Sequence, residues 1–371
     1  MASYEDLEFK VINTGICTVC GACILACPSS HIKFVEGKPK RSKREMDCVG
    51  CSTCYEACYM LRHDLIRNIE GSILGWGKRE SIGIYKRIVA ARTKEQNIKE
   101  ACQDGGIVTT FLIYALDKSI IDGALVVGRD SWMPVASIAK TRDEVILAAG
   151  TKYGVVPVLK ELRSAVIDHG LSKICVVGSP CHIQSIRYLK HKGLPLASSV
   201  KLTVSLFCRE NYDYQCMVEK ASDKGLNVDQ IDKFNVAEEF NVYACGKKLS
   251  FPITEVKGCI PKHCLVCEDF AGKLADVSIG SDGSPEGWST VIIRTEDGEA
   301  VFSGLEREGL IETKAADDLV YIREIAQRKK EKGKQTKDIF KLKEEGLDNK
   351  EIAAKLGITE DRVSHRLEGL Q

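Results

Sequence analysis

The 371-residue chain lacks the features that mark several broad classes of protein. Its formal net charge is only +1, so no overall field attracts it to nucleic acid or to anionic lipid. The opening residues, MASYEDLEFK, lack the basic and apolar regions of a secretory signal. No apolar run reaches the roughly 18 residues that cross a bilayer. We therefore expect a cytoplasmic protein, long enough for two or three domains.

Cysteine, in contrast, is abundant, with 17 residues. Cytoplasmic thiols are kept reduced, so this number indicates metal binding rather than disulfides. The stretches CTVCGACILACP and CVGCSTCYEAC share the spacing C-x2-C-x2-C-x3-C, which is the bacterial ferredoxin pattern for two four-iron clusters. Two zinc sites are the alternative, and the identity of the two spacings disfavours it.

The same spacing assigns the ligands of the two clusters. The first three cysteines of a run hold one cluster and the fourth crosses to the other. The assignment is Cys17, Cys20, Cys23 and Cys58 for cluster one, and Cys48, Cys51, Cys54 and Cys27 for cluster two. Tyr59 stands where a proline usually follows the last cysteine. Between the runs we expect a strand, a turn and a basic cluster that is either solvated or docks an acidic electron-transfer partner: Lys38, Lys40, Arg41, Lys43 and Arg44.

After a glycine-rich linker near residues 71–78, the pattern changes to that of an α/β body. Apolar runs of β type predict strands at 87–92, 123–128, 136–140, 173–178 and 201–207. Helical patterns cover 106–116 and 154–170, and antiparallel additions are expected at 240–251 and 289–302. No Rossmann fingerprint is present, because G-x-G-x-x-G does not follow the first strand.

Three loops are rich in glycine and hydroxyl groups: QDGG before the helix at 106–116, AGTKYG at 149–154 and GSDGSPEGWST at 280–290. Glycine lets the backbone approach a ligand, and free N–H groups at a helix start favour a phosphate. Each loop alone is only a turn. Three of them in one body favour a cofactor that carries a nucleotide.

Four further cysteines occupy predicted loops. Cys181 and Cys208 follow apolar strands, and ligands of open α/β sheets gather beyond the carboxyl ends of strands. With the pair Cys264 and Cys267 they predict a third iron–sulfur cluster, with structural zinc as the alternative. Cys259 has no assigned role. Small buried hydrophobic positions are expected for the others, Cys102, Cys175, Cys216 and Cys245.

A series of motifs over residues 83–333 resembles one family. QDGGIVT, AGTKY, PCHIQSIR, FCREN, HCLVCEDF, ADVSIGSDGSPEGWSTV and GLIETK are similar, in this order, to the beta subunits of coenzyme F420-reducing hydrogenases and dehydrogenases. The resemblance implies FAD, coenzyme F420 as substrate, and one four-iron cluster on Cys181, Cys208, Cys264 and Cys267. It also implies FAD contacts at Gly105, Gly106, Val108, Thr109, Thr151, Lys152, Tyr153, Ser281, Ser284, Gly287 and Ser289.

The implied cofactors suggest a mechanism. A deazaflavin carries hydride, iron–sulfur clusters carry single electrons, and a flavin handles both. We therefore expect hydride exchange between F420 and FAD, and single electrons passing through three clusters. No acid–base residue is required; Lys152 and Arg209 are candidates for steadying anionic parts of the cofactors, and surface ion pairs are the alternative.

The expected partner is another oxidoreductase: a hydrogenase, formate dehydrogenase, heterodisulfide reductase, sulfite reductase or membrane F420 dehydrogenase. In the last case the chain would be peripheral to the membrane, and a homo-oligomer within the complex is compatible with each. Two competing functions are an iron–sulfur redox sensor that regulates transcription and a ferredoxin-like adaptor without F420 activity.

The overall expectation is a multidomain chain of α+β and α/β type, divided at 1–75, 80–333 and 334–371. The last part predicts three short helices, and the final two have the cadence of a helix-turn-helix, with Gly357 at the turn and a capped helix from near Thr359. They resemble those of response-regulator output domains. The positive charge of the last helix is offset by neighbouring carboxylates: its basic residues are Arg362, His365 and Arg366, and its acidic residues are Glu360, Asp361 and Glu368. We therefore expect this tail to dock a partner subunit rather than nucleic acid.

Overall fold

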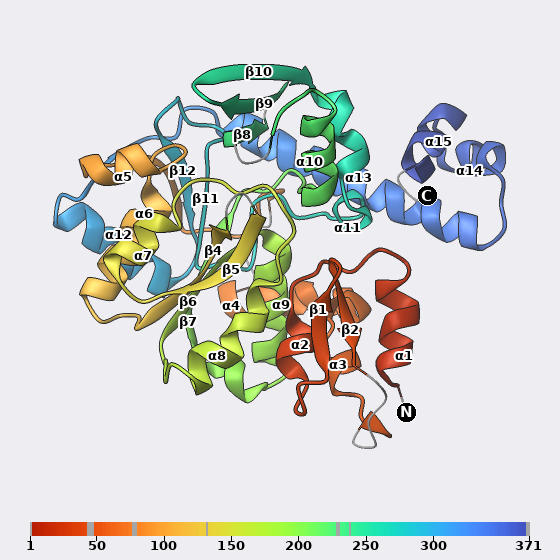
Figure 1. The fold of residues 1–371 in the computed structure, drawn as a ribbon, viewed down its shortest axis with the longest axis horizontal. Helices are drawn as coiled ribbons and strands as arrows, with labels where there is room; N and C mark the ends of the chain where they lie inside the picture. Colours follow the sequence, from red (N-terminus) through yellow and green to blue (C-terminus); the bar gives the residue numbers. More distant parts are fainter. Residues whose placement is uncertain are drawn as a thin grey trace.

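The computed structural model describes residues 2–42, 48–75, 80–130, 133–227, 231–236 and 239–368. Its architecture is mixed α/β, with a ferredoxin-like region at the N-terminus, a large central sheet between helices, and a group of helices at the C-terminus (Figure 1). None of the helices within the described ranges is long and apolar enough to cross a membrane.

The N-terminal region is built from short elements around a small apolar core. The strand and turn predicted between the cysteine runs are confirmed as an antiparallel hairpin, in which Val35 pairs with Lys38. Lys43 and Arg44 of the predicted basic cluster lie outside the described residues. The elements are α1 (Tyr4–Leu7), η1 (Glu8–Ile12), α2 (Ala22–Ala26), β1 (Ile32–Val35), β2 (Lys38–Arg41) and α3 (Thr53–Glu56).

The passage from this region to the body is helical. η3 (Tyr59–Leu65) continues into α4 (Ile66–Leu74), so the first part of the linker predicted near 71–78 is the end of a helix, and residues 76–79 lie outside the described residues. The N-terminal region also shares its apolar core with the body. Leu25 and Tyr59 belong to the same buried cluster as Leu159 and Ile183.

Eight strands form the central sheet, in the order β13-β3-β12-β11-β7-β6-β4-β5. β4, β6, β7 and β11 run parallel, while β5, β12 and β13 are antiparallel to their neighbours. All five predicted strands are confirmed, and the strands are β3 (Arg87–Thr93), β4 (Gly123–Asp130), β5 (Met133–Ala139), β6 (Ile174–Gly178), β7 (Val200–Leu206), β11 (Val277–Gly280), β12 (Ser289–Ile293) and β13 (Ile311–Lys314).

Helices cover both faces of this sheet because alternate strand residues point to opposite sides. Val126 faces a cluster formed with α5 (Gln96–Ala101), α6 (Ile107–Asp117), α7 (Arg142–Leu147) and α12 (Glu296–Arg307). Its neighbour Leu125 faces the other cluster, formed with η4 (Val158–Lys160), α8 (Glu161–Ile167), α9 (Pro180–His191) and η5 (Pro195–Ser199). The helix predicted at 106–116 is therefore confirmed, and that at 154–170 is a shorter pair, η4 and α8.

The antiparallel additions are confirmed in part. Residues 240–251 form β9 (Glu239–Ala244) and β10 (Lys247–Pro252), which build a separate three-stranded sheet with β8 (Ile231–Val236). α10 (Tyr214–Ser222) and η7 (Ile253–Cys259) pack on it, and α11 (Lys262–Leu265) follows. The expectation for 289–302 is wrong beyond Ile293, because Thr295 caps α12 by accepting a hydrogen bond from the Gly298 N–H at 3.2 Å.

The C-terminal segment begins with one long helix. α13 (Leu319–Glu344) runs continuously across the boundary predicted between 333 and 334, so the first of the three predicted short helices is its last part. α14 (Asn349–Leu356) and α15 (Glu360–Glu368) follow and stand away from the central sheet in Figure 1. Gly357 ends α14 in a left-handed conformation, and Thr359 accepts a hydrogen bond from the Arg362 N–H at 3.3 Å, as a cap does.

Candidate functional site

The sheet brings several of the predicted site residues to one edge. β3, β6, β7 and β11 point the same way, because β3 and β11 are both antiparallel to β12. The segments after their carboxyl ends contain Gly105, Cys181, Cys208 and Ser281. Ser289 opens β12 at the same edge. Such an edge is where open α/β sheets bind their ligands.

Four cysteines line one cavity of about 610 Å³. Cys181 lies in the first turn of α9, Cys208 follows β7, Cys264 lies in α11 and Cys267 follows that helix. Among the described residues no group of three or more His, Cys, Asp or Glu is arranged to hold a single metal ion. The cavity is larger than a cube of iron and sulfide, and four thiols that line it are the donor set of such a cube, so the residues present fit the predicted third cluster.

The protonation of these thiols reflects their burial and one buried cation. Burial raises the pKa of Cys181 well above its usual range and that of Cys208 to about 12. Lys329 of α13 lies beside them, is 8% exposed and donates a hydrogen bond to the Cys208 carbonyl oxygen at 2.5 Å. Burial lowers the pKa of Lys329, but the neighbouring cysteines outweigh this effect and raise it overall. A cation held there favours thiolate ligands.

The predicted ferredoxin ligands also gather in two groups. Those assigned to cluster one line a common cavity of about 20 Å³: Cys17, Cys20, Cys23 and Cys58. In the second group, burial and the nearby Cys27 and Cys51 raise the pKa of Cys54 to about 11. The Cys51 N–H donates to the Cys48 carbonyl oxygen at 3.3 Å, so Cys48 lies beside Cys51.

Two of the three glycine- and hydroxyl-rich loops are joined directly. The Gly105 N–H donates to Ser289 Oγ at 3.1 Å, and a Cβ on Gly105 would lie 2.5 Å from the Ala91 carbonyl oxygen, so only glycine fits there. Gly106, in the left-handed region, is the N-cap of α6, whose first turn contains Val108 and the buried Thr109. The start of α6 is therefore held at the sheet edge.

The remaining loop residues lie close to the same place. The Gly154 N–H donates to Asn211 Oδ1 at 3.0 Å, and the Asn211 N–H donates to Cys264 Sγ at 3.4 Å, so the second loop lies beside the four cysteines. The third loop reaches the same place through the ion pair of Asp282 with Arg209, which follows Cys208. Ser284 Oγ lies 2.6 Å from Thr290 Oγ1 within the third loop. The side chains or backbone at Thr151, Ser281 and Gly287 are exposed. This donor set of backbone and hydroxyl groups fits a nucleotide-bearing cofactor.

The two candidate cations differ in their surroundings. Lys152 donates to the carbonyl oxygens of Ala148 and Ala149, the latter at 2.6 Å, and burial, followed by Arg129, lowers its pKa to about 8. Arg209 pairs with Asp282 and donates to Tyr321 Oη at 2.8 Å. Arg209 therefore matches the predicted alternative of an ion pair, whereas Lys152 caps the end of α7.

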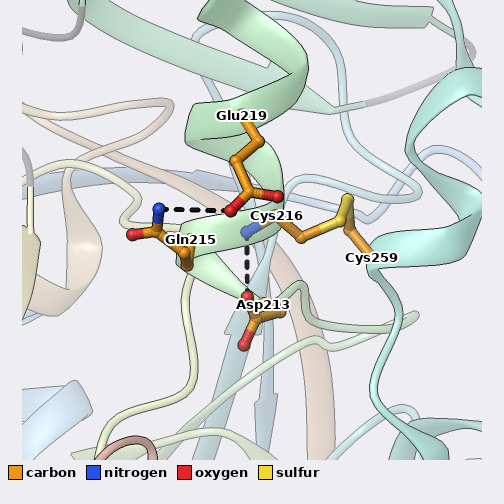
Figure 2. Close-up of a disulfide and its surroundings, with 5 residues drawn as sticks. All are labelled: Asp213, Gln215, Cys216, Glu219 and Cys259. Atoms are coloured by element: carbon orange, nitrogen blue, oxygen red, sulfur yellow. Dashed lines mark hydrogen bonds between the residues drawn. A yellow bond between two sulfur atoms is a disulfide. The ribbon is translucent and has the colours of Figure 1, made fainter.

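The expectation for the other cysteines needs three corrections. Cys216 and Cys259 form a disulfide between α10 and η7 (Figure 2). The expectation of a buried free thiol at Cys216 is therefore wrong, and so is the expectation that all cysteines are reduced. Cys245 is exposed, not buried, because it lies in the turn between β9 and β10, and Cys102 is half-buried. Cys175 is buried in β6, as expected.

Comparison with known proteins identifies the class of protein. Residues 88–163 match the N-terminal part, and residues 171–319 the C-terminal part, of the family of coenzyme F420 hydrogenase/dehydrogenase beta subunits. Residues 9–59 match a 4Fe-4S dicluster domain. The chain therefore belongs to this family of oxidoreductases and has an iron–sulfur domain at its N-terminus.

Individual relatives agree with this assignment. The chain is 38% identical to the beta subunit of the coenzyme F420 hydrogenase of Methanothermobacter thermautotrophicus over 72% of this chain and 98% of the relative. It is 28% identical to a subunit of the F(420)H(2) dehydrogenase of Methanosarcina mazei, over 81% and 85%. A chain of the F420-reducing [NiFe] hydrogenase complex from Methanosarcina barkeri superposes with a TM-score of 0.68 and 33% identity, covering 70% of this chain and 94% of that one.

Two residues at the site had no signal in the sequence analysis. Lys329 belongs to a helix with many charges, and only the docking of α13 against the segments of Cys208 and Cys267 separates it from the solvated ones. Ser185 lies within PCHIQSIR, but its hydrogen bond to Cys20 joins positions 165 residues apart.

Proposed function

We propose that this protein is the F420-linked subunit of an oxidoreductase complex. FAD is held by the loops at the carboxyl edge of the sheet, and coenzyme F420 is the hydride donor or acceptor. Three four-iron clusters pass electrons singly to or from a partner. The observation that carries this proposal is the contact of the segments of the four cysteines with the glycine- and hydroxyl-rich loops beside the carboxyl edge of the sheet.

The residues of the chain have distinct tasks in this proposal. When bound, FAD supplies the exchange between two-electron hydride chemistry and one-electron transfer. Cys181, Cys208, Cys264 and Cys267 hold the inner cluster beside the flavin loops. Lys329 offsets the negative charge of that cluster, since a buried cation beside buried thiolates lowers the energy of the charged state. Gly105 and Gly106 let the backbone at the start of α6 approach the cofactor phosphates.

The partner is proposed from the relatives, whose names include a hydrogenase, an F(420)H(2) dehydrogenase and a coenzyme F420-dependent sulfite reductase. Ser185 of the body contacts Cys20, a ligand of cluster one, so electrons pass between the body and the N-terminal region at this point. The two clusters of that region are then the exit toward the partner. The net direction of electron flow depends on the potential of the partner.

The test is the cofactor content and activity of anaerobically purified protein. We expect FAD, about twelve irons and about twelve sulfides per chain, because three four-iron clusters are proposed. Reduced F420 should reduce a one-electron viologen dye through the protein. About eight irons together with bound zinc would contradict the proposal of an inner iron–sulfur cluster. Bound FAD without any hydride exchange with F420 would instead support the ferredoxin-like adaptor. A sequence-specific DNA complex that depends on the clusters would instead support the redox regulator.

A further inference from the structure

Helix α9 carries a hydroxyl group from the body into the ligand set of the ferredoxin region. Ser185 Oγ donates a hydrogen bond to Cys20 Sγ at 3.2 Å, and the Ser185 side chain has no exposed surface. The backbone of Cys20 is fixed at the same place, because the Leu159 N–H donates to its carbonyl oxygen at 3.0 Å. The hydrogen bond therefore joins a buried hydroxyl group to a cysteine whose backbone is held by the body.

The same helix carries a ligand of the inner cluster one turn earlier. Cys181 and Ser185 are four residues apart in α9, so their side chains are neighbours on one helix face, with Cβ atoms about 5–6 Å apart. Tyr59 fills the space alongside. It is 2% exposed, lines the cavity of the inner cysteines and follows the cluster-one ligand Cys58. The path from Cys181 to Cys20 is therefore one helical turn and one hydrogen bond.

We propose that Ser185, through its hydrogen bond to the Cys20 thiolate, raises the reduction potential of cluster one, the ferredoxin cluster that exchanges electrons with the inner cluster. This inference rests on the proposed function, since it takes Cys20 as a ligand of cluster one. Reduction adds one electron to the cluster, which the inner cluster loses, and no proton moves. A donor on a ligand sulfur stabilises the more negative, reduced state, and hydrogen bonds to the sulfurs are known to set cluster potentials.

Burial makes the effect specific to this residue. If the hydroxyl is removed, no water is expected to replace it, because Ser185 has no exposed surface and its neighbours on the same helix face, Tyr188 and Leu189, are buried as well. The loss of a hydrogen bond to a charged group in a dry site is expected to change an equilibrium about tenfold. Cluster one should therefore be the single cluster that responds.

The experiment is a redox titration of anaerobic protein followed by electron paramagnetic resonance, with Ser185→Ala as the test variant. The signal of cluster one is the one that disappears in Cys17→Ala. In Ser185→Ala the ratio of reduced to oxidised cluster one at a fixed potential should fall about tenfold, which is about 59 mV toward more negative values for one electron. The other two clusters should keep their potentials.

The matched control is Tyr188→Phe on the same helix. The Tyr188 hydroxyl donates to the Glu56 carbonyl oxygen at 3.0 Å across the same interface. This bond ends on the backbone and not on a ligand sulfur, so its loss should leave all three potentials unchanged. Ser185→Thr, which keeps the hydroxyl, should keep the wild-type potential. An unchanged potential in Ser185→Ala, or an equal shift in Tyr188→Phe, would overturn the proposal.

Two further outcomes are distinguishable. If Ser185→Ala loses cluster one, Ser185→Thr decides: a retained cluster at the wild-type potential supports the hydroxyl, and its loss overturns the proposal. The titration uses chemical mediators and no F420, so a failure of the F420 chemistry would leave the result for Ser185 standing. A protein that holds no iron at all would instead refute the proposed function.

Discussion

Lys152 is a half-buried lysine whose ammonium group contacts backbone carbonyl oxygens at the end of α7 rather than a carboxylate. Burial lowers its pKa from 10.5 to about 8. Between these two values the unfolded chain binds more protons than the folded one, so the contribution of Lys152 to stability rises with pH across that window. Below about pH 8 the folded protein carries the penalty of a partly buried charge.

The first prediction follows from this pH window. The stability of wild type relative to Lys152→Met should increase as the pH rises from about 8 to about 10.5, as measured by urea midpoints of flavin-free protein. The exposed Lys192→Met is the matched control. A difference that stays flat with pH would contradict the burial argument. A bound anion would raise the pKa of Lys152, so a slope that vanishes only with FAD would identify a cofactor contact.

At the scale of residues, the sequence is most informative where the spacing of the residues along the chain determines which of them can bind the same cluster. The two ferredoxin runs predict their ligand groups because adjacent turns of chain determine which sulfurs meet. Nothing in the sequence pairs Cys216 with Cys259, since they are 43 residues apart and only the packing of α10 against η7 brings them together. The same holds for Ser185 and Cys20, which belong to different parts of the chain.

The disulfide in Figure 2 connects two elements that flank the inner cysteines. Cys208 precedes α10, and Cys264 follows η7 within α11. The Asp213 N–H also donates to the Cys259 carbonyl oxygen at 2.7 Å, so the two segments are held twice. The covalent link therefore limits how far the segments of Cys208 and Cys264 can separate in the unfolded chain.

We predict that this link contributes to stability through the closed loop of 43 residues, about 4 kcal/mol in the chain-entropy account. A mild thiol reductant should lower the melting temperature of wild type, and the double variant Cys216→Ser, Cys259→Ser should melt lower and no longer respond. Cys245→Ser, a change at an exposed cysteine of the same small sheet, should behave as wild type. Equal melting temperatures with and without reductant would contradict the prediction.

The prediction of elements succeeds where apolar runs are bounded by turn residues, as in β4 and β6. It fails at 289–302, where the strand and the following helix are joined by only Arg294 and Thr295 and the apolar pattern continues into α12. It also splits α13, because the boundary is placed where the family resemblance ends, at residue 333. Gly333 and Thr336 are buried there, so tertiary contacts hold that stretch in the helix.

For the whole molecule, we predict that the tail serves assembly. Deletion of residues 346–371 keeps the ion pair of Lys337 with Glu268 at 2.7 Å, so exchange between F420 and dye should stay at the wild-type rate. Co-purification of the partner oxidoreductase should fall. Arg362 and Lys355 provide too few phosphate contacts for DNA, since each adds about one unit of salt slope. Tight, sequence-selective DNA binding in gel-shift measurements, lost with the tail, would contradict docking.

The shared core of the N-terminal region and the body, in which Leu25 and Tyr59 pack with Leu159 and Ile183, has a kinetic consequence. Two separate carriers must first collide, and their reaction rate then depends on how much of each is present. Here the donor and acceptor sites are joined through one apolar core, so exchange between the inner cluster and cluster one would be unimolecular. Dilution or added viscosity would slow the encounters with F420 and with a separate partner, but not this internal step.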